Sequence, residues 1–224
     1  MEKKQIVKNV LKVMLIIIAI LIVILIIHSI RNYIIITDLQ KKISKYDDSS
    51  NHFIKSVYTE SNGTIIKSEY YQKDDKQVLF LEKKANEEIV KLSIYNNGKR
   101  IDTFAETKDV KEVTLNSEQL ININIINCLE TDNKWQTIIG SVISKIKSTK
   151  YNGKDCYIVK GFMPASSLSY EEQETYIDKD TGLVLKIKAI DIINEIEYEY
   201  EFNNVDDEIF VEPDISQYTL IEKK

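Results

Sequence analysis

Residues Val13 to Ile30, VMLIIIAILIVILIIHSI, decide how the rest of the chain is organised, and they contain no formally charged side chain. At 1.5 Å of rise per residue, a helix of roughly 18 to 20 residues covers the ~30 Å hydrocarbon core of a bilayer. Apolar residues occupy every side of this helix, whereas a helix in the core of a soluble protein usually keeps a polar stripe. We therefore predict a membrane-spanning helix, with a buried core helix as the alternative.

The charges that flank this run predict its direction. Four lysines precede it, from Lys3 to Lys12, and Arg31 is the only basic residue in the ten positions that follow. Because basic flanks stay in the cytoplasm, the amino terminus is expected inside and the rest of the chain outside. Extending the far flank to Lys45 equalises the two counts, so the prediction depends on the charges nearest the run.

The run is too long for a typical secretory signal peptide, whose apolar core has ~7 to 15 residues and ends in a small-residue cleavage site. It continues instead into His28, Ser29 and Arg31. An uncleaved signal anchor is favoured, with removal as the alternative. His28 lies near the far end, where its ring can reach the interface; a proton relay would need a partner that the segment lacks.

We expect residues 1–36 to form the cytoplasmic tail and anchor, residues 37–51 a stalk, and residues 52–224 one domain outside the membrane. Leu39 and Ile43 are spaced by four, which predicts a short helical stalk, and we expect it to be mobile. Five of the 30 basic residues and one of the 35 acidic residues precede residue 37, so the remainder has a formal charge of −9. This charge argues against a nucleic-acid partner and against flat docking on anionic lipid.

The clearest strand is Glu195 to Phe202, in which apolar and acidic residues alternate. A period of two places Ile196, Tyr198, Tyr200 and Phe202 on one face and the four glutamates on the other. The apolar face is therefore expected to pack. The acidic face could attract cations or a basic partner, but a solvated outer face is the ordinary use of alternating charge and is favoured here.

Turn signals separate further segments of alternating pattern. Asn-Gly pairs at Asn62, Asn97 and Asn152 favour hairpins, because both residues tolerate the positive φ of type I′ turns, and Gly182 ends a turn that begins at Asp178. These turns join neighbouring strands and therefore predict an antiparallel meander. The further strands that we predict are Thr64 to Gln72, Gln77 to Lys83, Glu88 to Tyr95, Lys99 to Glu106, Val142 to Tyr151, Asp155 to Phe162, Glu172 to Ile177 and Leu183 to Ile190.

Covering helices are expected at Ser117 to Leu129 and at Lys134 to Ser144, because consecutive apolar residues in Gln77 to Lys83 predict a strand covered on both faces. Helix is favoured over strand for the first of these segments, although it is rich in isoleucine and asparagine. Gly161 to Ser169 is predicted to be a loop.

Catalytic and metal-binding patterns are not found. Cys128 and Cys156 could form one disulfide outside the cytoplasm, or remain two buried thiols. His52 is the only histidine beyond the apolar run, no serine lies in a nucleophile elbow, and the residues from Asp178 to Ala189 lack the glycine and glutamate of a calcium loop. We therefore expect no enzyme, no cofactor and no metal site.

Large apolar and aromatic side chains are abundant for a domain of this size, and the chain has 13 tyrosines. A curved antiparallel sheet with covering helices can either pack such residues solidly or leave an apolar cavity. Tyrosine suits the wall of such a cavity, because its ring is apolar and its hydroxyl can meet a polar group.

Several hairpin phrases resemble the closing half of the LolA-like lipoprotein-carrier superfamily. They are Tyr151 to Val159, Tyr176 to Leu183, Tyr200-Glu201-Phe202, and Phe210 with Pro213-Asp214. The resemblance extends loosely over Phe53 to Leu220 and implies an unclosed, curved antiparallel half-barrel with a helical lid, able to hold acyl chains. No individual ligand-contacting residue of the superfamily matches, and an anchored chain cannot ferry cargo as the soluble carriers do.

We therefore expect an α+β, mainly β protein, in which a transmembrane helix precedes a curved antiparallel half-barrel with covering helices. The expected function is a non-catalytic, single-pass module outside the cytoplasm that binds a hydrophobic or lipid-like ligand. The bilayer, through Val13 to Ile30, is the expected partner. The alternative is a protein-interaction or sensor module of an envelope complex with no small ligand.

Overall fold

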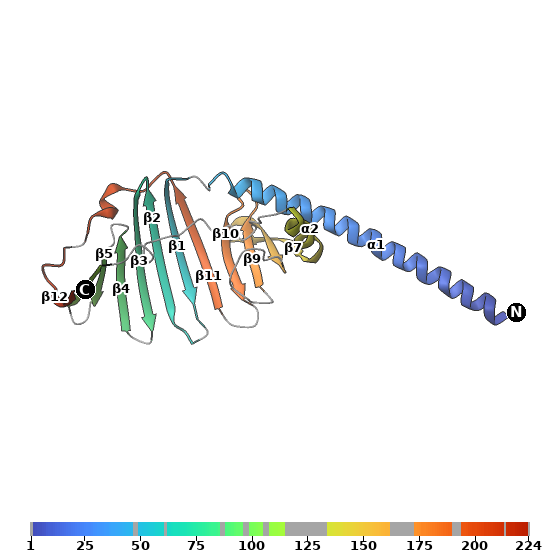
Figure 1. Ribbon diagram of the computed structural model, residues 1–224, viewed down its shortest axis with the longest axis horizontal. Helices are drawn as coiled ribbons and strands as arrows, with labels where there is room; N and C mark the ends of the chain where they lie inside the picture. The colour runs from blue at the N-terminus through green and yellow to red at the C-terminus, as the bar shows by residue number, and fades with distance from the viewer. Residues whose placement is uncertain are drawn as a thin grey trace.

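The computed structural model describes residues 2–46, 49–60, 62–85, 88–95, 99–104, 108–114, 134–161, 173–189, 194–212 and 214–223. Its elements are α1 (Glu2–Ile43), β1 (Asn51–Thr59), β2 (Ile65–Lys73), β3 (Lys76–Ala85), β4 (Glu88–Tyr95), β5 (Lys99–Phe104), β6 (Asp109–Thr114), α2 (Lys134–Ile143), β7 (Lys145–Tyr151), β8 (Lys154–Lys160), β9 (Gln173–Asp178), β10 (Val184–Ala189), β11 (Asn194–Phe202), the 3₁₀ helix η2 (Asp207–Phe210) and β12 (Thr219–Lys223) (Figure 1). The predicted class, α+β and mainly β, is confirmed. The segments predicted at 117–129 and 161–169 lie outside the described residues, apart from Gly161.

The described strands form one open sheet in the order β12-β6-β5-β4-β3-β2-β1-β11-β10-β9-β8-β7. Two antiparallel meanders, β1 to β6 and β7 to β11, join where β1 pairs with β11. The predicted antiparallel hairpins are thus confirmed. The parallel pairing of β12 with β6 was not predicted.

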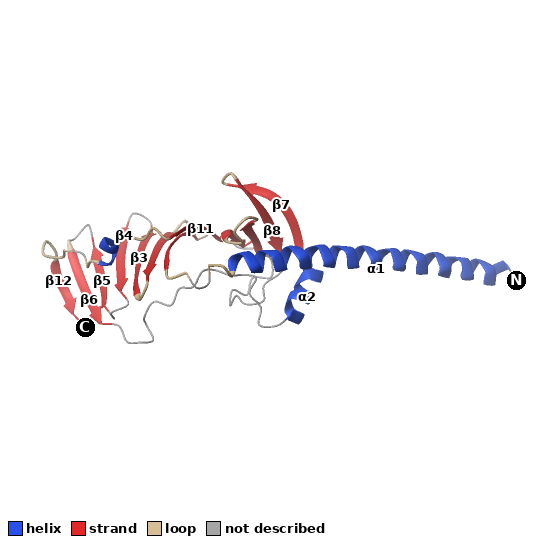
Figure 2. Cartoon of the chain, turned by 90° about the horizontal axis from the view of Figure 1, so that it is seen from above, coloured by secondary structure: helices blue, strands red, loops and turns tan. Residues whose placement is uncertain are grey.

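The sheet has a face that carries the helices and a face that does not. Figure 2 shows α1 and α2 on one side, while the β7–β8 hairpin curves toward the other. We call the side contacted by α1 the inner face and the opposite side the outer face. Residues paired across neighbouring strands share a face, so the register assigns each side chain to one of the two.

The last turns of α1 complete a core on the inner face. Ile36 and Leu39 are fully buried against Ile146, Ile177 and Val184 and their neighbours in β7 to β10. A buried leucine of this kind contributes about 1.5–3 kcal/mol. The predicted helical continuation of the anchor is therefore present as far as Ile43, but its apolar side chains belong to the core and not to an exposed stalk. The division at residues 36 and 51 stays a prediction.

The turn between β9 and β10 shows why α1 can lie so close to the sheet. Gly182 has φ +78°, as the left-handed turn position predicted, and a Cβ at this residue would lie 2.6 Å from the carbonyl oxygen of Leu39. In the same turn, the carbonyl oxygen of Lys179 accepts a hydrogen bond of 2.6 Å from Lys42 Nζ. The backbone of α1 thus packs directly against the turn.

A second core lies on the outer face at the other end of the sheet. Val78, Tyr95, Ile101 and Val110 are buried there, and the segment from η2 to β12 covers them with Ile209, Phe210, Ile215 and Tyr218. Because this segment crosses the outer face from β11 to the far edge, it delivers β12 to β6 as a parallel neighbour. Figure 1 shows this crossing at the end of the chain.

The apolar run in β3 contributes side chains to both faces of the sheet, and among the described residues the predicted cover is confirmed for the outer face only. Val78 and Phe80 join the outer core, while Leu79 and Leu81 point to the inner face. β3 is therefore covered on its outer face by the end of the chain.

Candidate functional site

The predicted apolar residues of β11 lie on the inner face. Ile196, Tyr198, Tyr200 and Phe202 are all half-buried, and Tyr198 packs against the core that α1 completes. The ring of Phe202 lies 4.4 Å from that of Tyr46, just beyond the end of α1. The strand thus continues the inner core toward the middle of the sheet.

The register extends this surface across three further strands. Ile54 and Tyr58 in β1 pair with Tyr200 and Ile196, and β2 and β3 continue each row. We define the inner apolar face by the apolar members of these rows, which are Ile54, Tyr58, Ile66, Tyr70, Leu79, Leu81, Ile196, Tyr198, Tyr200 and Phe202. Sequence reasoning found only its β11 part, because the register that aligns the other strands involves residues far apart in the chain.

Two hydrogen bonds join polar side chains that lie in the rows of the inner apolar face. Ser56 Oγ and Ser68 Oγ are 2.7 Å apart, and Tyr70 donates its hydroxyl proton to Gln72 Oε1 at 2.8 Å. Burial raises the pKa of Tyr70 to about 12, so its hydroxyl stays protonated. The face therefore offers aliphatic and aromatic surface with neutral hydroxyl groups, which suits a hydrophobic molecule with a small polar end.

His52 and Cys156 are placed where they cannot cooperate. His52 lies on the inner face of β1, whereas Cys156 lies on the outer face of β8, and β9, β10 and β11 separate the two strands. Burial lowers the pKa of His52, against the opposing effect of its 2.8 Å hydrogen bond to the carbonyl oxygen of Ser49. Burial raises the pKa of the Cys156 thiol, which makes it a poor nucleophile.

The predicted disulfide stays a prediction. Cys156 is fully buried, and its Sγ donates to the carbonyl oxygen of Lys154 at 3.5 Å. Cys128 lies outside the described residues.

The acidic row of β11 carries its own counter-charges. Lys186 Nζ lies 2.6 Å from Glu195 Oε2 and 3.1 Å from Glu197 Oε1, and Lys55 Nζ lies 3.3 Å from Glu199 Oε2. Hydrogen bonds from Lys186 lower the pKa of Glu195, and a hydrogen bond from Tyr151 lowers that of Glu197. The Lys55–Glu199 pair is exposed, and a pair of this kind contributes little to stability, about 0–1 kcal/mol.

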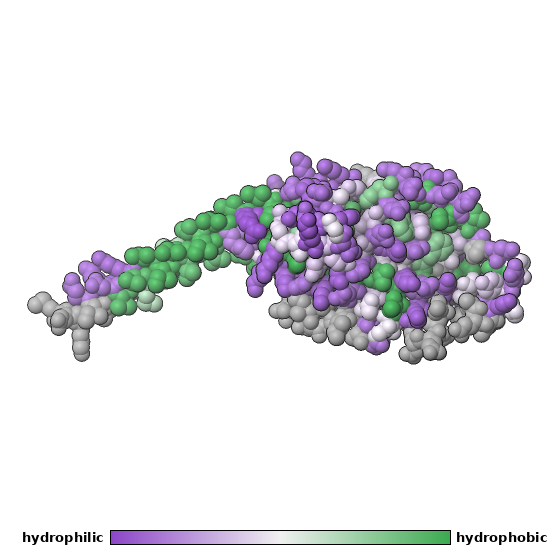
Figure 3. Space-filling view, turned by 180° about the vertical axis from the view of Figure 1, so that it is seen from behind, coloured by the Kyte–Doolittle hydropathy of each residue, from purple (hydrophilic) through white to green (hydrophobic). Residues whose placement is uncertain are grey.

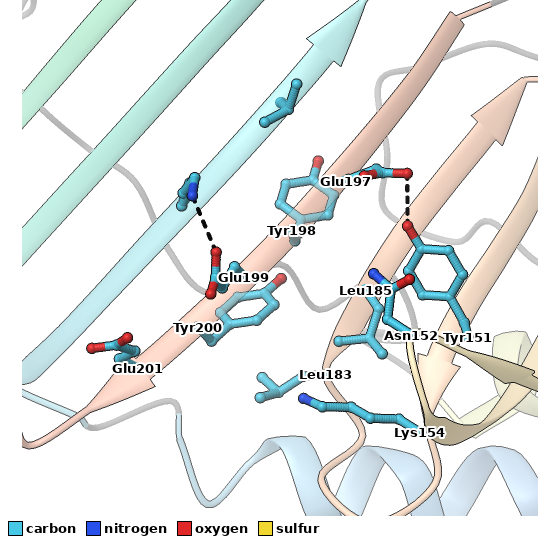
Figure 4. A pocket seen from close by; sticks show the side chains of 12 residues that line it. Tyr151, Asn152, Lys154, Leu183, Leu185, Glu197, Tyr198, Glu199, Tyr200 and Glu201 are labelled. Atoms are coloured by element: carbon cyan, nitrogen blue, oxygen red, sulfur yellow. Dashed lines mark hydrogen bonds and ion pairs between the residues drawn. The ribbon is translucent and has the colours of Figure 1, made fainter.

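A cavity of about 500 Å³ lies on the outer face beneath the tip of the β7–β8 hairpin (Figure 4). Tyr151 reaches over it and donates its hydroxyl proton to Glu197 Oε1 at 2.7 Å. Leu183 and Leu185 line the cavity from the β9–β10 side, together with the ion-paired row. Among the described residues no group of three or more His, Cys, Asp or Glu could hold a metal ion.

Beyond the domain, α1 is long and apolar enough to cross a membrane, from Lys8 to Ile43, and its most apolar window is entirely unburied. Figure 3 shows this apolar surface as a continuous band along the helix. Monomeric soluble proteins rarely expose apolar patches of this extent. The helix is therefore compatible with a single-pass anchor or a signal sequence.

No family model and no curated protein matches the sequence. Among solved structures, an uncharacterized conserved protein from Thermus thermophilus is similar, with 10% identity and a TM-score of 0.46 over 83% of this chain and 98% of that one. MucB has 13% identity and a TM-score of 0.42 over 82% of this chain and 64% of that one. A LolA superfamily protein from Nitrosomonas europaea has 9% identity and a TM-score of 0.24 over 77% of this chain and 97% of that one.

Identities of 9–13% and TM-scores below 0.5 say nothing about what this chain binds. Its role has to be inferred from its own residues.

Proposed function

We propose that this chain is a membrane-tethered, non-catalytic module outside the cytoplasm that binds a hydrophobic or lipid-like ligand on its inner apolar face. The proposal rests on the alignment of apolar residues across neighbouring strands on that face. Ten aliphatic and aromatic side chains from four adjacent strands share it, and the row that contains Tyr58 and Ile66 ends at Lys83 in β3. Most of these side chains are only half-buried, so part of the apolar surface remains within reach of a ligand.

The tether supports the proposal because it is joined rigidly to the sheet. α1 continues without a break from its apolar span to Leu39, which is buried in the inner core. A ligand-binding face held in this way stays close to the bilayer, where lipid-like molecules are concentrated. The lysine-rich start of α1 supports a cytoplasmic amino terminus and therefore supports a position of the sheet on the outer side.

A protein-interaction module with no small ligand is the alternative. The β7 edge of the described sheet does not favour it, because Lys145, Lys147 and Lys150 lie in that strand. Charged side chains, and lysine in particular, prevent edge strands from pairing with other chains. The ion-paired acidic row of β11 likewise leaves little uncompensated charge for a basic partner.

Photo-crosslinking of the full chain tests the proposal. A palmitate analogue that carries a diazirine is added to the protein in lipid nanodiscs and irradiated, and the labelled peptides are identified by mass spectrometry. Because bilayer contacts also label α1, only peptides of the sheet are compared. We expect labelling of β1, β2 and β11.

Two variants on neighbouring strands separate the two faces. Ile196→Gln places an amide on the inner face, whereas Val57→Gln places the same amide on the outer face beside the 500 Å³ cavity; both residues are half-buried. Labelling of the sheet should fall in Ile196→Gln and persist in Val57→Gln. If labelling instead falls in Val57→Gln and persists in Ile196→Gln, the ligand binds in the outer cavity. An unlabelled sheet in the wild type would refute ligand binding.

A further inference from the structure

The distribution of residues around α2 is the reverse of that in a soluble amphipathic helix. Its buried side consists of small residues, Thr137, Gly140 and Ser141, and Ser144 follows at the same spacing. Its exposed residues are mostly large and apolar, namely Trp135, Ile138, Ile139, Val142 and Ile143, beside the polar Lys134 and Gln136; Trp135 is 70% exposed, and Ile139 and Ile143 are each 59% exposed. In water this arrangement would leave five large apolar side chains solvated on a ten-residue helix.

The small side of α2 packs on α1 at one fixed position. Asn32 is fully buried, and its Nδ2 donates to the carbonyl oxygens of Ser141 at 3.1 Å and Ser144 at 2.8 Å. His28 Nε2 lies 3.1 Å from the same Ser144 oxygen. Asn32 thereby pairs the carbonyl group of Ser141, one of the last four in α2, and both side chains lie within hydrogen-bond distance of the Ser144 carbonyl just beyond its end. Close packing through small residues with polar side chains as links is the usual way in which helices associate in membranes.

The contact lies at the level where α1 leaves the hydrocarbon core. His28 is two residues before Ile30, the end of the apolar span, which corresponds to about 3 Å along the helix axis. Figure 2 shows α2 running across the direction of α1 and not along it. With α1 upright in the bilayer, α2 therefore lies along the membrane surface.

We propose that α2 is an interfacial membrane helix, whose apolar side enters the boundary between lipid headgroups and acyl chains. The inference rests on the part of the proposed function that places α1 across the bilayer. Interfacial helices bury their apolar face about 5–10 Å into this boundary, and tryptophan is enriched there. Lys134, the first residue of α2, and Lys145, two residues after its end, are exposed and can meet lipid phosphates, although the domain as a whole is acidic.

This second contact would fix the orientation of the domain as well as its distance from the bilayer. α2 leads directly into β7, so the β7 end of the sheet is held at the membrane and the β12 end lies farthest from it (Figure 1). The contact with α1 and the contact with lipid together prevent the domain from swivelling about its anchor.

Trp135 is the only tryptophan in the chain, so its fluorescence reports on α2 without any mutation. The full chain is reconstituted into phosphatidylcholine vesicles, and incorporation is measured by flotation after alkaline extraction. We expect blue-shifted emission that is quenched by phosphatidylcholine brominated on the upper acyl chain and protected from acrylamide in the water.

A matched reporter at the far end of the sheet provides the control. Val211 is also 70% exposed, so Trp135→Phe combined with Val211→Trp moves the indole to an equally exposed site near η2. This variant should be quenched by acrylamide and not by brominated lipid. If Trp135 in incorporated protein is also quenched by acrylamide and not by brominated lipid, α2 does not touch the membrane. The proposal that α1 is a membrane anchor would remain. If the chain fails to incorporate, both the anchor and the α2 contact are refuted.

Discussion

The close contact of α1 with the β9–β10 turn predicts how much stability the substitution Gly182→Ala removes. At φ +78°, alanine incurs the cost of the left-handed region, roughly 1–2 kcal/mol. Its Cβ would also lie 2.6 Å from the Leu39 carbonyl oxygen and 3.0 Å from the Ile43 nitrogen. Both are backbone atoms, so no rotamer change relieves the contact and α1 must move, which adds about 1–3 kcal/mol as for other overpacked sites.

Gly153→Ala is the matched control, because Gly153 has φ +79° and its Cβ would meet nothing within 4 Å. We therefore expect a loss of about 2–5 kcal/mol for Gly182→Ala and only about 1–2 kcal/mol for Gly153→Ala. Thermal unfolding of the full chain in detergent, followed by circular dichroism of the β-sheet signal, measures both. Equal losses in the two variants would refute the close approach of α1 to the sheet.

Two further predictions concern buried side chains. Leu39→Ala should destabilise the domain by about 3–5 kcal/mol. Ile34→Ala, at a position 60% exposed on the same helix, should change the stability by less than about 0.5 kcal/mol. Equal losses of stability in the two variants would show that α1 does not enter the core. Because burial lowers the pKa of His52, the unfolded chain gains a proton first as the pH falls below about 6.5, so the free energy of unfolding should fall by up to about 1.4 kcal/mol per pH unit in that window. His52→Gln should remove this dependence in urea titrations between pH 5 and 7, and an unchanged dependence would contradict the assignment.

Local signals in the sequence predicted most of the individual elements, although β1, β6 and β12 were not among the predicted strands. The alternation in Glu195 to Phe202 reports which side chains share a face, and Asn152 and Gly153 adopt the positive φ values, +48° and +79°, that a type I′ turn requires. The helix at α2 was also predicted within one residue of its observed end. These features depend on neighbours in the chain, and so they can be predicted from the chain alone.

The assembly of the elements could not be predicted in the same way. The burial of Leu39 depends on strands more than a hundred residues away, and the parallel position of β12 depends on the path of the chain across the outer face. The sequence of α2 shows apolar residues, but only the packing against Asn32 determines which of them stay exposed. The inner apolar face likewise emerges only when the register aligns four strands.

Native mass spectrometry of the full chain, purified from membranes in a mild detergent, tests the central claim most directly. After collisional release of the micelle, the protein should retain one lipid-like molecule, seen as a discrete added mass that organic extraction removes and identifies. The bare mass of the chain alone, with no lipid recovered by extraction, would contradict the claim that the inner apolar face holds a ligand.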